Sequence, residues 1–272
     1  MSVEALFERA GDDRFVATEF ARGPWDPASC HGGPVAALLT RAVERAEVGD
    51  GVDCQLSRLT VELTRPVPVG KVLAVSTLVE RPGRRVSLVA GLMLHDGVEV
   101  ARVRSLRMRS EDLAIPVDGA VSGTADRLEP GPHGATLEVL STGGNTESIV
   151  SFARDGCEHR FVRGTSTAPG AAEVWMRLRV PVIAGEVPTG AQRAAAMADF
   201  GNGVSRLVDF EQFLFINPDL TVHLLRPPSG EWIGLRAVSF YGPRGAGMAD
   251  SAIYDEHGVV GRGVQSLYLD RR

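Results

Sequence analysis

Residues 59–64 alternate between apolar and polar side chains, with Leu59, Val61 and Leu63 separated by Thr60, Glu62 and Thr64. This two-residue period is that of a β-strand with one face buried. Further strands are predicted over residues 72–79, 86–94 and 98–108. The Asp96-Gly97 dipeptide between the last two is a strong hairpin signal. Short turns between successive strands predict an antiparallel meander.

One helix is predicted before this meander. His31-Gly32-Gly33-Pro34 opens it, and proline suits the first helical turn because its missing N–H loses no hydrogen bond there. The residues that follow, 35–43, are apolar on nearly every side, which is typical of a buried helix and not of a surface helix. A buried helix followed by a long antiparallel sheet indicates a sheet wrapped around a central helix.

The second half of the chain repeats this order. Early strands are predicted at residues 160–162, which echo residues 14–16, and at residues 173–180. A helix opens at Thr189 and runs to Phe200, and the glycines at 201 and 203 end it. Four strands are then predicted over residues 215–225, 232–240, 247–254 and 259–269. The intervening residues, from about 110 to 155, are richer in Gly, Ser and Pro and are expected to connect the two halves.

Two segments of the chain are repeated at the same offset. Residues 59–66 match residues 220–227, and residues 96–106 match residues 257–267, each 161 positions later. We interpret the repeat as two copies of one α+β unit, residues 1–112 and 156–272, joined by a connecting segment at 113–155. Polar positions that differ between the copies become candidates for function, and the offset places Gln265 opposite Arg104.

The composition is that of a globular protein, with 44% hydrophobic residues and a net charge of −5. This charge gives no electrostatic argument for nucleic-acid binding.

The three cysteines are odd in number and widely spaced, which argues against a disulfide framework or a metal site. No signal peptide or 18-residue apolar stretch is found, so we expect a soluble, cytoplasmic protein without a membrane span. A nucleophile elbow and a phosphate-binding glycine motif are also missing from the sequence.

Several short motifs, taken in order, resemble a known family. They are His31-Gly32-Gly33, Val174-Trp175-Met176-Arg177, Asp199, the segment from Asp219 to Pro227, and Val264-Gln265-Ser266. Together with the repeat, they resemble the double-hotdog acyl-CoA thioesterases of the thioesterase II type. The resemblance implies a tandem hotdog fold, in which each unit is an antiparallel sheet wrapped around a long central helix. It also implies hydrolysis of acyl-CoA, with coenzyme A as part of the substrate, no other cofactor or metal, and a homodimer or higher homo-oligomer.

The resemblance also implies the catalytic residues. Members of the family use an Asp, a Thr and a Gln of the second unit to hold and activate the hydrolytic water. The Asp maps to Asp199 and the Gln to Gln265, but the position of the Thr holds Asn217. Thr221 is the alternative hydroxyl, although its counterpart Thr60 in the first copy suggests a structural role.

The residues themselves leave alternatives open. Asp199 follows five apolar residues at the end of a helix, where the helix dipole disfavours a carboxylate, and a residue placed against local preference is often functional. It could equally form an exposed turn with Gly201. Gln265 can hold a water molecule between a base and a thioester, or it is a solvent-facing strand residue.

The segment His31-Gly32-Gly33 has a functional and a structural interpretation. Glycines at a helix start offer free N–H groups to a thioester carbonyl or a phosphate, or they form a tight turn. Three roles are open for His31: contact with a ligand, a structural role, or the acid/base of a hydratase or dehydratase. A non-catalytic acyl-CoA-binding protein is the third possible function, and the Asn217 departure supports it. Arg81, Arg84 and Arg85 either meet phosphates or form a solvated turn.

Overall fold

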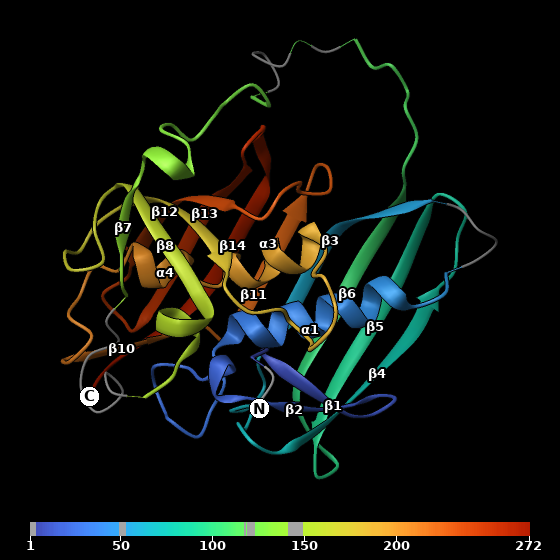
Figure 1. The fold of residues 1–272 in the computed structure, drawn as a ribbon, viewed down its shortest axis with the longest axis horizontal. Coiled ribbons are helices and arrows are strands. Elements are labelled where there is room, and N and C mark those ends of the chain that lie inside the picture. Colours follow the sequence, from blue (N-terminus) through green and yellow to red (C-terminus); the bar gives the residue numbers. More distant parts are fainter. Residues whose placement is uncertain (1–3, 49–52, 117, 119–122, 141–148) are drawn as a thin grey trace.

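The computed structural model describes residues 4–48, 53–116, 118, 123–140 and 149–272, and their strands form one 14-stranded antiparallel sheet with few helices (Figure 1). The first half contains β1 Phe7–Gly11, β2 Arg14–Ala17, α1 Gly32–Arg45, β3 Cys54–Glu62, β4 Val72–Arg81, β5 Val86–His95 and β6 Val98–Arg109. The second half contains β7 Thr136–Glu138, β8 Cys157–Arg163, β9 Ala172–Leu178, α3 Gly190–Ala198, α4 Gly201–Val204, β10 Phe213–Ile216, β11 Asp219–Leu224, β12 Ile233–Tyr241, β13 Ala246–Asp255 and β14 Gly258–Arg271.

The strand order corrects the predicted meander. Along the sheet the order is β1-β2-β4-β5-β6-β3-β11-β14-β13-β12-β9-β8-β7, with β10 also on β14. The meander of β4, β5 and β6 is confirmed, but β3 pairs with β6 and β11 and not with β4. The segment between β3 and β4 contains Pro66 and Pro68, which cannot donate to a ladder and therefore suit a chain that leaves the sheet. The pairing of β3 with β11 joins the two halves of the chain.

This central pairing confirms the first repeated segment. Thr60 lies opposite Thr221, and Leu59 lies opposite Val222, so each copy of the strand faces the other across the middle of the sheet. Leu59 and Val61 of the first copy and Leu220, Val222 and Leu224 of the second are buried, and Leu63 is partly buried. The offset of 161 therefore relates structurally equivalent residues in these two strands.

The offset of 161 is wrong by one residue for the second repeated segment. In the β5–β6 hairpin His95 pairs with Val98, and in the β13–β14 hairpin Asp255 pairs with Gly258, an offset of 160. The structural counterpart of Gln265 is therefore Ser105 and not Arg104. Both Ser105 and Gln265 are buried, whereas Arg104 is exposed and pairs with Glu80. A shift of one residue moves a strand residue to the opposite face of the sheet.

The helices differ in length between the two halves. The predicted buried helix in the first half is the 14-residue α1, which lies across the face of the sheet in Figure 1. In the second half the helix is broken into the nine-residue α3 and the short α4, with Asp199 and Phe200 between them. The glycines at 201 and 203, which were expected to end the helix, instead lie within α4, and the break before them places Asp199 at a helix end.

The two helices α1 and α3 meet at glycines. A Cβ atom on Gly33 would lie 2.4 Å from the backbone oxygen of Ala196, so only glycine permits this close approach. Apolar residues of both helices, including Leu38, Leu39 and Met197, are fully buried in a single core that spans both halves. This packing brings the first turn of α1 to the last turn of α3.

A strand predicted over residues 215–225 is two strands in the structure. Asn217 and Pro218 separate β10 from β11, and both strands pair with β14. The proline, which has no N–H to donate, accounts for the interruption of the ladder. Asn217 is thereby turned out of the regular alternation of the sheet.

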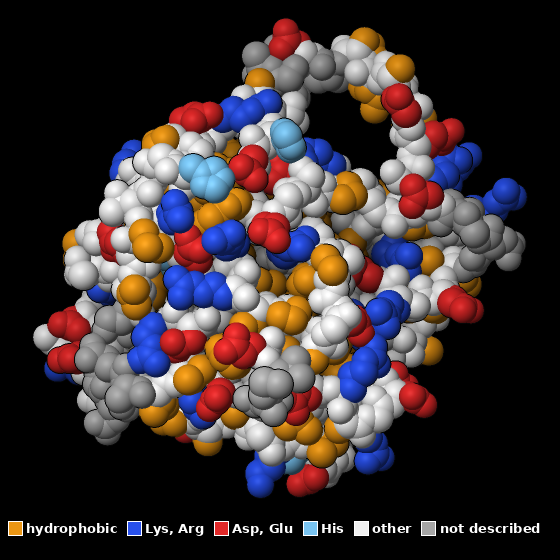
Figure 2. Space-filling model, in the orientation of Figure 1, with side chains coloured by type: hydrophobic (Ala, Val, Ile, Leu, Met, Phe, Trp, Pro, Cys, Tyr) orange, Lys and Arg blue, Asp and Glu red, His pale blue; other side chains and the backbone are white. Residues whose placement is uncertain are grey.

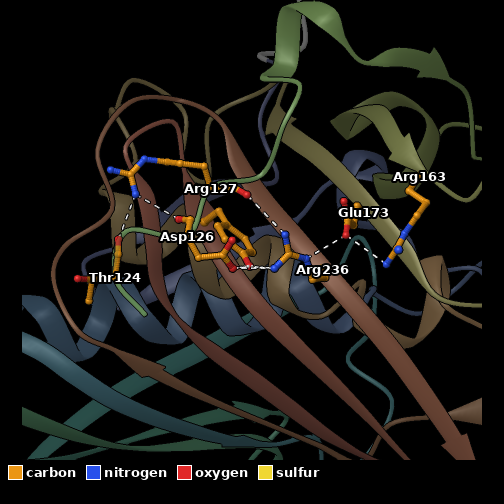
Figure 3. A network of polar contacts seen from close by, with 7 residues as sticks. Thr124, Asp126, Arg127, Arg163, Glu173 and Arg236 are labelled. Atoms are coloured by element: carbon orange, nitrogen blue, oxygen red, sulfur yellow. Dashed lines mark hydrogen bonds and ion pairs between the residues drawn. The ribbon is translucent and has the colours of Figure 1, made fainter. Parts of the chain in front are cut away.

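Residues 123–140 are fastened to the second half by the contacts of Arg236 on β12. Figure 3 shows this side chain between Glu173 and Asp126, with Nε 2.9 Å and Nη1 2.7 Å from their carboxylate oxygens. Leu128 packs in a small buried cluster with Trp175, Trp232 and Tyr254. Trp232 is therefore a core residue.

Acidic and basic side chains are interspersed on the face shown in Figure 2. Among the helices that the structure describes, none has the length and apolar character needed to span a bilayer.

Candidate active site

A cavity of about 550 Å³ opens where the start of α1, the end of α3 and the break between β10 and β11 meet. His31, Gly32, Asp199 and Asn217 line it. The remaining wall is largely aromatic and aliphatic, and it includes Val35, Leu63, Phe200, Trp25, Phe210 and Phe215. A mostly apolar cavity with a few converging polar groups is the usual form of a small-molecule site.

Asp199 is the polar centre of this cavity. It ends α3 and is only 6% exposed, so it does not form an exposed turn. Its Oδ1 accepts hydrogen bonds from Nδ2 of Asn217 at 2.7 Å and from Nε2 of Gln265 at 3.2 Å. Gln265 is 1% exposed, and its Nε2 also donates to the backbone oxygen of Asp199 at 3.0 Å. Gln265 is therefore not a solvent-facing residue, and the three side chains converge as the sequence predicted.

His31 contacts the other oxygen of the same carboxylate. Its Nδ1 lies 2.8 Å from Oδ2 of Asp199, while the N–H of Gly33 lies 3.1 Å from that same Nδ1. One ring nitrogen cannot donate to the carboxylate and accept from Gly33 at once. Donation to a carboxylate is charge-assisted and is the stronger of the two bonds. We therefore assign the proton to Nδ1, which releases the Gly33 N–H for another acceptor.

Gly32 allows the start of α1 to approach the carboxylate. A Cβ atom on this residue would lie 2.7 Å from Oδ2 of Asp199 and 2.9 Å from a methyl carbon of Leu63. The first turn of a helix carries free N–H groups and positive partial charge. The two glycines thus have different roles: Gly32 leaves space for the Asp199 carboxylate, and Gly33 lets α1 pack against α3.

Comparison with known proteins gives the family. The model of the acyl-CoA thioesterase C-terminal domain matches residues 116–269, and the model of the N-terminal domain matches residues 21–108. The chain belongs to the acyl-CoA thioesterase family. It is thus a thioesterase, as the sequence motifs indicated. A search of curated proteins found no match.

Solved structures similar to this thioesterase have the hotdog fold. A hotdog-fold protein of unknown function from Alicyclobacillus acidocaldarius is 17% identical, covers 97% of this chain and 95% of its own, and has a TM-score of 0.70. A putative thioesterase from Novosphingobium aromaticivorans is 19% identical, with 97% and 98% coverage and a TM-score of 0.69. The acyl-CoA thioesterase II TesB2 of Mycobacterium marinum is 16% identical, with 98% and 95% coverage and a TM-score of 0.65.

Thr221 lies apart from the cluster in this thioesterase. Its hydroxyl donates to the hydroxyl of Thr60 at 3.2 Å, across the central β3–β11 pairing, and it does not line the cavity. Thr221 therefore lies where a structural residue would, as the presence of Thr60 at the equivalent position of the first copy suggested. Asn217 contacts the carboxylate directly.

Two buried residues of the site region were missed in the sequence. Asn202 donates its backbone N–H to Oε1 of Gln265 at 3.1 Å, and His159 on β8 packs edge-on against Phe200 with ring centroids 4.9 Å apart. Asn202 stands between two glycines, where the sequence predicted the end of a helix and no functional residue. His159 lies inside a strand with no motif around it, so the sequence carried no signal for it.

Proposed function

We propose that this thioesterase hydrolyses acyl-CoA thioesters to a free acid and coenzyme A, with Asp199 as the general base. The observation that carries the proposal is the buried Asp199 carboxylate, held by Asn217 and Gln265 on one oxygen and by His31 on the other, at an aromatic-walled cavity. General-base catalysis needs a carboxylate fixed within reach of the water that it activates. An apolar wall suits the acyl group of the substrate.

In the proposed reaction, Asp199 takes a proton as water oxygen bonds to the thioester carbonyl carbon. The negative charge that develops on the carbonyl oxygen is stabilised by N–H groups of the first turn of α1, among them that of Gly33. The carbon–sulfur bond then breaks, and the proton passes from Asp199 to the thiolate of coenzyme A. His31, which donates to Oδ2, holds the carboxylate in one orientation throughout.

Asn217 fits this role although the family pattern has Thr there. A threonine hydroxyl and an asparagine amide can each donate one hydrogen bond to a carboxylate oxygen. The bond from Asn217 to Asp199, at 2.7 Å, supports retention of the donor despite the change of residue. The departure therefore does not favour a non-catalytic binding protein.

The proposal includes the wider expectations for this chain. The residues would form two hotdog units, 1–112 and 156–272, joined by 113–155, and the repeated strands that pair at Thr60 and Thr221 support this division. Coenzyme A would enter only as part of the substrate, with no other cofactor. A cytoplasmic location and a homodimer or higher homo-oligomer belong to the same proposal.

The release of free thiol from a panel of acyl-CoAs tests the proposed function. Asp199→Asn keeps the shape of the side chain but removes the base, and we expect kcat to fall by about 10²–10⁴-fold. Asn217→Thr should keep activity close to that of the wild type, because the donor is retained. Asp250→Asn is the matched control, since Asp250 pairs with Arg262 at the surface.

Three outcomes would contradict the proposal. Thiol release that Asp199→Asn leaves unchanged would remove Asp199 from the mechanism. Addition of water to an enoyl-CoA that depends on His31 would favour a hydratase. Tight binding of acyl-CoA without turnover of any substrate in the panel would indicate a binding protein.

A further inference from the structure

The buried side-chain amide of Gln265 can donate to Asp199 in only one of its two orientations. A glutamine amide can be turned through 180°, which exchanges a donor for an acceptor. In the structure Nε2 faces the carboxylate and backbone oxygens of Asp199, and both of these can only accept. Its Oε1 faces the backbone N–H of Asn202, which can only donate. The reversed amide would therefore place oxygen against oxygen at one end and N–H against N–H at the other.

Asn202 is itself held in one orientation. It is 4% exposed, and its Nδ2 donates to the backbone oxygen of Phe215 at 3.2 Å, a group that can only accept. Its Oδ1 accepts from the hydroxyls of Ser239 at 3.1 Å and Tyr241 at 2.8 Å. Every polar atom of this side chain thus has a partner, so the position of α4 relative to β10 and β12 is fixed.

We propose that Asn202 is a positioning residue, which aims its backbone N–H at Gln265 and so keeps the Gln265 amide directed at Asp199. This inference rests on the proposed function. Asn202 connects the three elements that carry the candidate site. It follows Asp199 by three positions, its side chain binds Phe215 two positions before Asn217, and its backbone binds Gln265 on β14. A buried network with every member satisfied specifies a single arrangement.

The glycine before Asn202 supports the same arrangement. A Cβ atom on Gly201 would lie 3.0 Å from Oε1 of Gln265 and 2.7 Å from Oγ of Ser251. The backbone at positions 201 and 202 therefore runs directly beside the carbonyl end of the Gln265 amide. A side chain at 201 would displace that amide, which explains why the polar residue lies after a glycine.

The test compares Asn202→Asp and Asn202→Ser with Ser205→Ala. Asn202→Asp puts an oxygen against the Phe215 carbonyl, and we expect kcat to fall by up to about 100-fold with KM nearly unchanged, since small misplacements at a reacting centre have effects of this size. The hydroxyl of Ser205 belongs to the same buried network but contacts Gly201 and Ser239 and neither side chain of Asn202 and Gln265. The backbone N–H of Ser205, which donates to the Asn202 carbonyl, is retained in Ser205→Ala. Ser205→Ala should lower Tm without lowering kcat.

Two further readouts separate positioning from a general effect on folding. In a Gln265→Ala background, Asn202→Ser should cause no additional loss of kcat, because Asn202 acts through Gln265. The side-chain NH₂ resonances of Gln265 should shift in the Asn202 variants and not in Ser205→Ala. Losses of kcat that multiply in the double variant, or equal losses in Ser205→Ala, would overturn the proposal. If the wild type releases no thiol, the proposed function fails, while the amide resonances still decide the role of Asn202.

Discussion

Phe200 contacts two histidines with different surroundings. His31 lies at the cavity and contacts Asp199, whereas His159 is 1% exposed and its Nε2 has no hydrogen-bond partner in the described chain. Burial, together with the nearby charges of Arg179 and His31, lowers the pKa of His159 to about 3. His159 is therefore neutral in the folded protein at ordinary pH, and its proton equilibrium affects stability.

His159 should make the fold sensitive to acid. Its pKa of about 3 in the folded state is below the ordinary value of 6.5, so between these values the unfolded chain binds a proton that the folded chain does not. The stability present above pH 6.5 is lost as the pH falls, by up to about 1.4 kcal/mol per pH unit. Denaturant unfolding at pH 7 and pH 5 measures this, with His159→Leu expected to show the smaller decrease. Equal decreases in the two proteins would contradict it.

At the scale of elements, the contact between α1 and α3 sets the position of the candidate site. The carboxylate comes from the end of α3, while the N–H groups and His31 come from the start of α1. Two successive glycines determine the distance between these helices, and a Cβ atom would meet a flexible carboxylate at Gly32 but a helix backbone at Gly33. The two positions should therefore respond differently to the same substitution.

Gly32→Ala should reduce activity, and Gly33→Ala should reduce stability. The first variant displaces the Asp199 carboxylate, for which we expect kcat to fall by roughly 10²-fold, with a small change in Tm. The second forces α1 and α3 apart at a cost of about 1–3 kcal/mol. Thiol-release kinetics and denaturant unfolding measure the two effects. Gly203→Ala, also at the cavity, is the control for an added methyl group that displaces nothing, because no atom lies within 4 Å of a Cβ there. The same loss of kcat and stability at both positions would refute this distinction.

Local patterns predicted the elements and the pairing of β4, β5 and β6, but not the pairing of β3. The two-residue period indicated β3, the turn signals indicated the strands after it, and the apolar run after His31 indicated α1. The placement of β3 beside β11 depends on contacts between distant segments, which no local period encodes. The one-residue error at Gln265 arose because one residue fewer lies between β11 and its hairpin than between β3 and its own. Chance similarity of the sequences hid this deletion.

The candidate site was predictable where residues stand against local preference or match the family. Asp199 at a helix end and Gln265 in a strand were found in this way, and the structure brings both to one cluster with Asn217. Asn202 could not be found, because asparagine between glycines is ordinary at a helix end and its partners come from β10, β12 and β14. His31 was weighed as one of several possibilities, and only the fold shows its contact with Asp199.

At the scale of the whole molecule, Arg236 anchors the start of the connecting residues 123–140 to the second half. Arg236 donates to Asp126 and to the hydroxyl of Tyr254, and its Nη2 lies 3.5 Å from the backbone oxygen of Arg127 (Figure 3). The hydroxyl of Tyr254 donates in turn to Asp126 at 2.7 Å. These bonds hold residues 126 and 127, whereas Pro130, Pro132 and β7 have separate contacts with β8 and β9. The local opening of the segment around residue 127 therefore depends on few contacts.

Arg236→Gln should therefore expose the peptide bond after Arg127 to trypsin without unfolding the sheet. The shorter, neutral side chain loses the ion pairs to Asp126 and Glu173, while the buried cluster around Trp175 stays in place. We expect cleavage after Arg127, followed by mass spectrometry, to be several-fold faster than in the wild type, in proportion to the population of the open segment. Arg262→Gln is the matched control, since it breaks a surface ion pair with Asp250 far along β13 from this segment. Cleavage at the same rate in both variants would contradict a role for Arg236 in holding residues 126 and 127.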